Sequence, residues 1–145
     1  MKIKVKHVNA FTNKIDGGNP AGVLIDSPSL SDSQMAFITK ELEVSETAYV
    51  YPSNKADCKV RFFSPSIEVN LCGHATIATF YTMALENILV KDNITMETKA
   101  GILPINIIND YKGNIERVMM TQAKPILKDI YLDTVSYTHL TLPTN

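Results

Sequence analysis

The chain has no concentration of charge of either sign. Its 145 residues include 14 lysine and arginine residues and 15 aspartate and glutamate residues, for a net charge of −1, and the basic residues form no block. Electrostatic binding of nucleic acid needs a basic face on the protein. The composition therefore argues against nucleic acid as a partner.

A hydrophobic run long enough to span a membrane is also missing. The longest uncharged stretch before the last residues of the chain, which includes Leu71 to Leu85, is shorter than the run of about 20 apolar residues that a spanning helix needs. Met1 leads into lysine-rich, strand-like sequence and not into a signal peptide. We expect a cytoplasmic protein of one domain that makes no membrane contact.

Cysteine is scarce, with only Cys58 and Cys72 in the chain. Two cysteines do not make a disulfide framework. The nearest histidine is His74, so the two thiols do not form a CxxC-type zinc site either. We therefore expect neither a disulfide scaffold nor a zinc site of this type.

Residues 135–145 contain no charged residue and are rich in threonine. This string resembles translated read-through of a sequencing adaptor, and we interpret it as a non-native tail. The natural protein is then expected to continue past residue 133 or 134. On this interpretation, residues 1–134 are the truncated N-terminal lobe of a longer protein.

The hydrophobic pattern of the remaining chain predicts one α+β lobe, with antiparallel strands wrapped around a central helix. A capping box at residues 31–34, flanked by Leu30 and Met35 as a hydrophobic staple, predicts a first helix. Short apolar or alternating runs separated by turn residues predict strands at residues 3–11, 21–25, 48–51, 58–63, 94–98, 102–108 and 115–121.

The uncharged run from Leu71 to Leu85 predicts the central helix. Because this helix is uncharged all round, we expect it to be covered on every side. Backbone N–H groups at a helix start have no intrahelical partner and favour an anion. A substrate carboxylate is thus expected against Gly73 and His74. Apolar residues recur at the helical period at Ile77, Phe80, Tyr81, Ala84, Leu85 and Ile88.

Four segments in this order resemble the PhzF-like phenazine-biosynthesis family of isomerases. They are residues 18–23 (GNPAGV), 45–48 (SETA), 63–65 (FSP) with Glu68, and 71–76 (LCGHAT). The resemblance implies a fold like diaminopimelate epimerase, with two similar lobes and the site in the cleft between them. It implies isomerase chemistry on a small carboxylate without cofactor or metal, with the missing C-terminal lobe as a partner. Proton transfer is then assigned to Glu46, and substrate binding to Gly73 and His74.

Each of these residues also has a plainer interpretation. A proton shuttle needs a carboxyl that both takes and returns a proton, but most glutamates are solvated, and Glu46 could be an exposed loop residue. At a helix start the neutral form of His74 is favoured, and its ring could simply bond to a neighbouring loop. Asn19 could offer its amide to the substrate, or could serve only the Asn-Pro turn. For Glu68 we first expect a structural role, because a carboxylate near a helix start is favoured by the helix dipole.

Two other functions remain open at this point. Racemases that need no cofactor use two thiols, one on each side of the substrate carbon, and a thiol at a helix N-terminus, such as Cys72, would have a lowered pKa. The second thiol would have to come from the absent lobe, and Cys72 could instead be a buried structural cysteine. Alternatively, the chain is an inactive lobe that only associates with itself, as a homodimer, or with a partner lobe.

Overall fold

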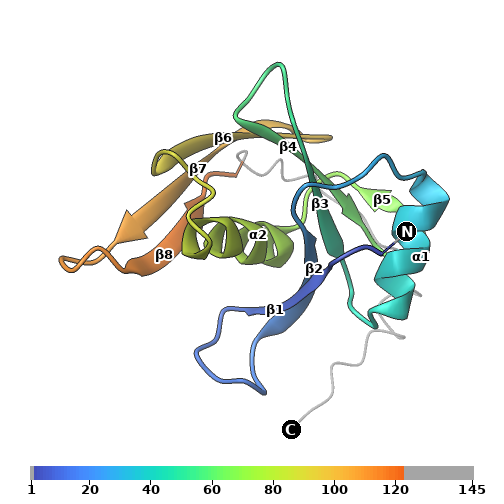
Figure 1. Ribbon diagram of the computed structural model, residues 1–145, viewed down its shortest axis with the longest axis horizontal. Coiled ribbons are helices and arrows are strands. Elements are labelled where there is room, and N and C mark those ends of the chain that lie inside the picture. Colours follow the sequence, from blue (N-terminus) through green and yellow to red (C-terminus); the bar gives the residue numbers. More distant parts are fainter. Residues whose placement is uncertain (1, 123–145) are drawn as a thin grey trace, which may run out of the picture.

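A computed structural model describes residues 2–122 and shows one curled sheet with two helices (Figure 1). The strands and helices follow one another along the chain as β1 (Lys6–Ala10), β2 (Asn19–Leu24), α1 (Asp32–Glu41), β3 (Thr47–Tyr51), β4 (Cys58–Phe63), β5 (Glu68–Val69), α2 (Gly73–Leu85), β6 (Asn93–Thr98), β7 (Gly101–Asn109) and β8 (Ile115–Met120).

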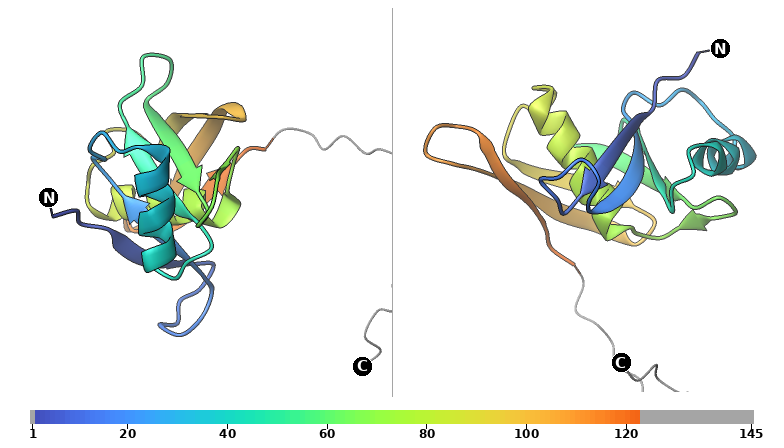
Figure 2. Two further views of the ribbon diagram at one scale, coloured as in Figure 1. Left: turned by 90° about the vertical axis from the view of Figure 1, so that its right-hand side faces the viewer. Right: turned by 90° about the horizontal axis from the view of Figure 1, so that it is seen from below.

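The sheet has the strand order β1-β2-β3-β4-β6-β7-β8, and β5 pairs with β4. It curls around α2, while α1 lies on its outer side (Figures 1 and 2). The expected α+β lobe with strands wrapped around a central helix is confirmed. Its strands are not all antiparallel, because β2 pairs with β3 and β4 with β6 in parallel. In each case a helix connects the two strands and returns the chain to run in the same direction.

The strand predictions hold closely where burial alternates along the strand. The bounds of β4 match the prediction, whereas β1 starts at Lys6 and not at Ile3. The two-residue strand β5 was not predicted, because two residues carry no periodicity.

The start of α1 follows the predicted capping box. The Gln34 N–H donates to Ser31 Oγ at 3.3 Å, and the Ser31 N–H donates back to Gln34 Oε1 at 2.9 Å. Met35 is fully buried and packs with Leu30 in a small cluster under α1. The hydroxyl of Tyr49, on β3, donates to the Met35 carbonyl at 2.8 Å, so α1 is fixed against the outer face of the sheet.

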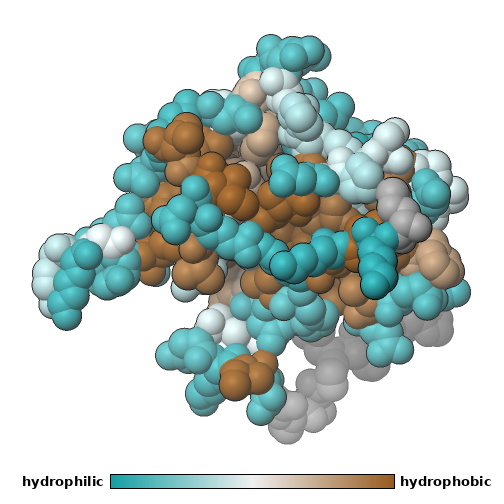
Figure 3. Space-filling model, in the orientation of Figure 1, coloured by the Kyte–Doolittle hydropathy of each residue, from teal (hydrophilic) through white to brown (hydrophobic). Residues whose placement is uncertain are grey.

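The exposure of α2 differs from the prediction of cover all round. Of the predicted apolar stripe, only Phe80 is buried, while Tyr81, Leu85 and Ile88 are exposed. Apolar side chains accordingly gather over the middle of the face where α2 lies (Figure 3). The buried residues of the helix are mostly small, namely Ala75, Thr76, Ala78, Thr79 and Thr82, together with Phe80 and Met83.

Hydrogen bonds within α2 make this arrangement possible. The hydroxyls of Thr76, Thr79 and Thr82 each donate to the carbonyl four residues earlier, at 2.7 Å. Bonded in this way, the threonines present mainly their methyl groups to the sheet. Small side chains let the helix axis approach the curled sheet closely, which the longer residues of the predicted stripe would prevent.

A hydrogen-bonded carboxylate joins the β3–β4 turn to β6. Asp57 accepts bonds from the N–H and the hydroxyl of Thr95, both at 2.8 Å, and pairs with Lys91 at 2.8 Å. Lys91 first, and then Thr95, lower the pKa of Asp57 to about 2. A carboxyl whose pKa is depressed in the folded state stabilises the fold above its unfolded pKa of about 3.9, and this stabilisation is lost as the pH falls.

We expect Asp57→Asn to lower the melting temperature at neutral pH. The difference from the wild type should shrink as the pH falls from about 4 to about 2, because the wild-type carboxyl then also becomes neutral. Thermal unfolding followed across this pH range measures it. Asp16→Asn, at an exposed carboxylate of the β1–β2 loop, is the matched control. An unchanged difference at pH 2 would contradict the role assigned to the charge.

Within residues 2–122, no helix is long and apolar enough to cross a membrane. The predicted non-native tail at 135–145 lies outside the described residues, and so does the end of the predicted lobe, residues 123–134.

Candidate active site

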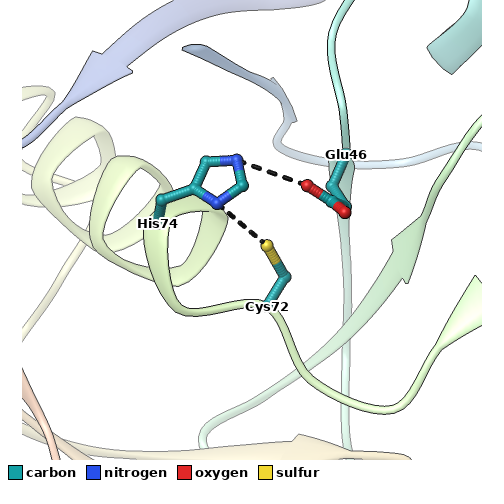
Figure 4. Close-up of side chains that lie close together, drawn as sticks. All are labelled: Glu46, Cys72 and His74. Carbon is teal, nitrogen blue, oxygen red and sulfur yellow. Dashed lines mark hydrogen bonds and ion pairs between the residues drawn. The ribbon is translucent and has the colours of Figure 1, made fainter. Parts of the chain in front are cut away.

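Glu46, Cys72 and His74 come together at the start of α2 (Figure 4). Glu46 immediately precedes β3, Cys72 immediately precedes α2, and His74 lies in the first turn of α2. One carboxylate oxygen of Glu46 lies 3.5 Å from His74 Nε2, and Cys72 Sγ lies 3.3 Å from His74 Nδ1. The side chain of Glu46 is 23% exposed and that of His74 is 10% exposed. Two residues predicted from the sequence therefore meet in one half-buried group.

The backbone of Glu46 is held by the neighbouring strand β2. The N–H of Gly22 donates to the Glu46 carbonyl at 3.0 Å, and Gly22 is the register partner of Thr47. A Cβ atom on Gly22 would lie 2.4 Å from Thr47 Oγ1. Only glycine lets the two strands approach this closely without displacing Thr47.

The N-terminus of α2 presents backbone N–H groups that have no partner within the helix. The first backbone bond of the helix runs from the Thr76 N–H to the Cys72 carbonyl, at 3.0 Å. The N–H groups of Gly73, His74 and Ala75 therefore have no partner within the helix. A Cβ atom added to Gly73 would have nothing within 4 Å, so the space beside Gly73 is open. This is the environment in which a carboxylate binds well.

The partners of His74 differ at its two ring nitrogens. Nε2 faces the Glu46 carboxylate and lies 3.3 Å from Ser45 Oγ, whereas Nδ1 faces the Cys72 thiol. A carboxylate can only accept, so we assign the ring proton to Nε2, and Nδ1 then accepts from the thiol. The ring is thus placed between the carboxylate of Glu46 and the thiol of Cys72.

The thiol of Cys72 is not activated. Cys72 is 8% exposed, and this burial raises its pKa to about 11. The Glu46 carboxylate also raises the pKa of Cys72, whereas the N–H groups of Ala75 and His74 lower it. The expectation that the helix N-terminus lowers this pKa is therefore wrong. Loss of hydration outweighs the helix donors.

Two further residues of the sequence motifs lie apart from this group. Asn19 begins β2, is exposed and pairs with Ala10; within the described residues no side-chain hydrogen bond joins it to Glu46 or His74. Glu68 accepts two bonds from Arg61, each at 2.8 Å, and Arg61 lowers the pKa of Glu68. Glu68 thus does structural work, as expected, by tying β5 to β4.

Sequence reasoning did not assign Gly22 or Ser45 to the site. Both lie within the motif segments at residues 18–23 and 45–48. Motif membership was thus an available signal, but only the parallel pairing of β2 with β3 shows that Gly22 supports Glu46.

Comparisons with known proteins identify the family of the chain. Residues 8–142 match the PhzC-PhzF family model, described as phenazine biosynthesis-like protein. An uncharacterised isomerase of Clostridium acetobutylicum is 42% identical over 85% of the chain and 41% of its own length. An uncharacterised isomerase of Salmonella typhimurium is 35% identical over 97% of the chain and 48% of its own length.

The crystal structure of a Bacillus anthracis protein of the PhzF family superposes with a TM-score of 0.72 at 43% identity, covering 78% of the chain and 38% of that protein. The chain thus spans less than half of the length of these relatives. Its match to the family model nevertheless extends over most of its own length. The chain belongs to the PhzC-PhzF family of phenazine biosynthesis-like proteins.

Proposed function

We propose that this chain supplies the acid/base half of an isomerase that moves a proton on a small carboxylate substrate. Glu46 takes the proton from one carbon and returns it to another, while Gly73 and His74 hold the substrate carboxylate. The reaction needs neither cofactor nor metal, because one carboxyl group can serve first as base and then as acid. Asn19 is a further candidate contact for the substrate.

One observation carries this proposal: the Glu46 carboxylate lies beside His74 at the open N-terminus of α2. A substrate carboxylate bound to the free N–H groups there would place its neighbouring carbon atoms next to Glu46. The names of the relatives from Clostridium acetobutylicum and Salmonella typhimurium, both isomerases, support the reaction class.

A second lobe completes the site in this proposal. The chain covers 41% and 48% of these two relatives, so more than half of each has no counterpart here. Glu46 and His74 are part-exposed, and a facing wall would exclude water and strengthen their bonds to substrate. We propose that this wall is a C-terminal lobe, the partner of the present chain.

The two-thiol racemase is the less favoured enzyme. Burial raises the pKa of Cys72 to about 11 and that of Cys58, on β4, likewise to about 11, so neither thiol is a ready base. The non-enzymatic alternative draws support from the exposed Tyr81, Leu85 and Ile88 of α2, which could join two copies of the chain. Analytical ultracentrifugation distinguishes a dimer from a monomer.

Proton exchange with solvent tests the proposed function directly. A two-lobe protein that contains this lobe is incubated in deuterium oxide with a panel of small carboxylic acids that carry an acidic C–H bond. Incorporation of deuterium at carbon, followed by proton NMR, is expected for at least one acid. Failure to exchange any of them, with the folded protein, would count against a proton-moving isomerase.

Gly73→Ala tests where the substrate carboxylate lies. The added methyl group meets nothing within 4 Å and improves helix propensity, so the melting temperature should not fall. It would, however, occupy the open space beside Gly73, where the substrate carboxylate is proposed to lie. We expect KM to rise about 10-fold, equivalent to about 1.4 kcal/mol. An unchanged KM would place the carboxylate elsewhere.

A further inference from the structure

Three different metal-binding groups meet at the start of α2. The Cys72 sulfur, one ring nitrogen of His74 and one carboxylate oxygen of Glu46 all lie within 4.8 Å of one another. The sulfur and His74 Nδ1 are already 3.3 Å apart. Around a tetrahedral zinc ion, sulfur, nitrogen and oxygen ligands lie about 3.3–3.6 Å from one another, given the usual bond lengths. The Cys72–His74 pair therefore already has the spacing of two ligands of one ion.

The third ligand needs a rotation of its side chain. Glu46 is a part-exposed side chain with free rotatable bonds, and its carboxylate lies beside His74 Nε2, whereas the Cys72 sulfur lies beside the other ring nitrogen, Nδ1. Cys72 and His74 are fixed more firmly, because both are held by the first turn of α2. A rotation of the Glu46 side chain brings its oxygen within bonding distance of an ion held by the other two residues.

We propose that Glu46, Cys72 and His74 form an inhibitory zinc site, with water in the fourth position. Thiolate, imidazole and carboxylate are ligands that zinc takes readily, whereas magnesium and calcium prefer oxygen ligands alone. On binding, the thiol bond to hydrogen breaks, a sulfur–zinc bond forms, and the proton goes to solvent. The two negative ligands then balance the charge of the ion.

Bound zinc would stop the reaction proposed above, because the carboxylate that transfers the proton would be engaged by the metal. The inhibition, but not the binding, rests on the proposed function. The spacing of Cys58 and Cys72 excludes a zinc site built from both thiols, but it does not bear on a site built from Glu46, Cys72 and His74, because Glu46 is distant from the other two in the sequence.

Cobalt(II) in place of zinc tests the binding on this chain without any enzyme assay. A folded wild-type chain should develop a sulfur-to-cobalt charge-transfer absorption in the near ultraviolet, which zinc should abolish by displacement. We expect a zinc dissociation constant of about 1 µM or lower. Cys72→Ser should remove the absorption and weaken zinc binding by more than about 100-fold, since even the outer partners of metal ligands are worth about 10–100-fold in affinity.

Cys58→Ser is the matched control, because Cys58 is also a buried cysteine but lies on β4 outside this group. This variant should keep both the absorption and the affinity. If Cys72→Ser fails to fold, protection of Cys72 from alkylation by zinc in the wild-type chain, measured by peptide mass spectrometry, replaces it. Lack of the absorption in the folded wild type, of zinc protection, or of any effect of Cys72→Ser would overturn the site.

Inhibition is tested separately on the two-lobe protein. Micromolar zinc should suppress deuterium incorporation, and a chelator should restore it. If zinc binds but deuterium incorporation continues, the inhibitory role is overturned, while the zinc site itself still stands. If no acid exchanges even without zinc, the proposed function fails, and the cobalt absorption still decides whether the site exists.

Discussion

Replacing Glu46 with glutamine should lower the rate of deuterium incorporation by about 10²–10⁴-fold in a two-lobe protein that contains this lobe. The amide keeps the size and shape of the carboxylate and can still face His74, whose Nε2 lies 3.5 Å from the carboxylate. It cannot accept and return a proton. Substrate binding, measured by calorimetry, should therefore change little while exchange is lost.

Glu43→Gln is the matched control for this substitution. Glu43 is an exposed glutamate just beyond the end of α1, so the same chemical change there should leave exchange at the wild-type rate. Retained exchange in Glu46→Gln would remove Glu46 from the mechanism.

Cys72→Ser separates the two enzyme classes. Serine keeps the approximate size of cysteine and removes the thiol, so a glutamate mechanism should tolerate it far better than Glu46→Gln. A two-thiol racemase should instead be disabled by the loss of one of the two thiols that transfer the proton. An inactive Cys72→Ser enzyme combined with an active Glu46→Gln enzyme would reverse the assignment.

How far the sequence predicts this molecule depends on the range of the forces involved. The capping box of α1 is a local feature, since Ser31 and Gln34 bond to each other whatever surrounds them, and the sequence predicts it correctly. The burial of α2 is not local. Periodicity favours Tyr81 and Leu85 as core residues, yet close packing on a curved sheet selects the alanine and threonine side.

The candidate site is likewise predictable from the sequence only in part. The resemblance indicates Glu46 and His74, and the structure brings their side chains together. The sequence does not predict the raised pKa of Cys72, because its helix position favours the thiolate while burial by distant segments opposes it. Nor does it indicate that Gly22 supports Glu46, since that contact depends on β2 and β3 lying in parallel register.

Gly22→Ala should destabilise the fold and disturb Glu46 together. The new methyl carbon would lie 2.4 Å from Thr47 Oγ1, 2.8 Å from Thr47 Cγ2 and 3.0 Å from Leu42 Cδ1. Overpacking of this kind costs about 1–3 kcal/mol, which chemical denaturation would measure. Because Thr47 follows Glu46 directly, its displacement should also lower kcat in the exchange reaction. Gly73→Ala, where the methyl group meets open space, is the matched control for stability.

Thr47→Ala should rescue Gly22→Ala, because it removes both atoms of Thr47 that the new methyl group would meet. Thr47 Oγ1 is buried and has no hydrogen-bond partner among the described residues, so this change alone breaks no hydrogen bond there. The double variant should therefore be more stable than the sum of the two single changes predicts, with a coupling of about 0.5–3 kcal/mol in a double-mutant cycle. Additive losses would mean that Gly22→Ala acts through the backbone conformation of residue 22 and not through the position of β3, which begins directly after Glu46.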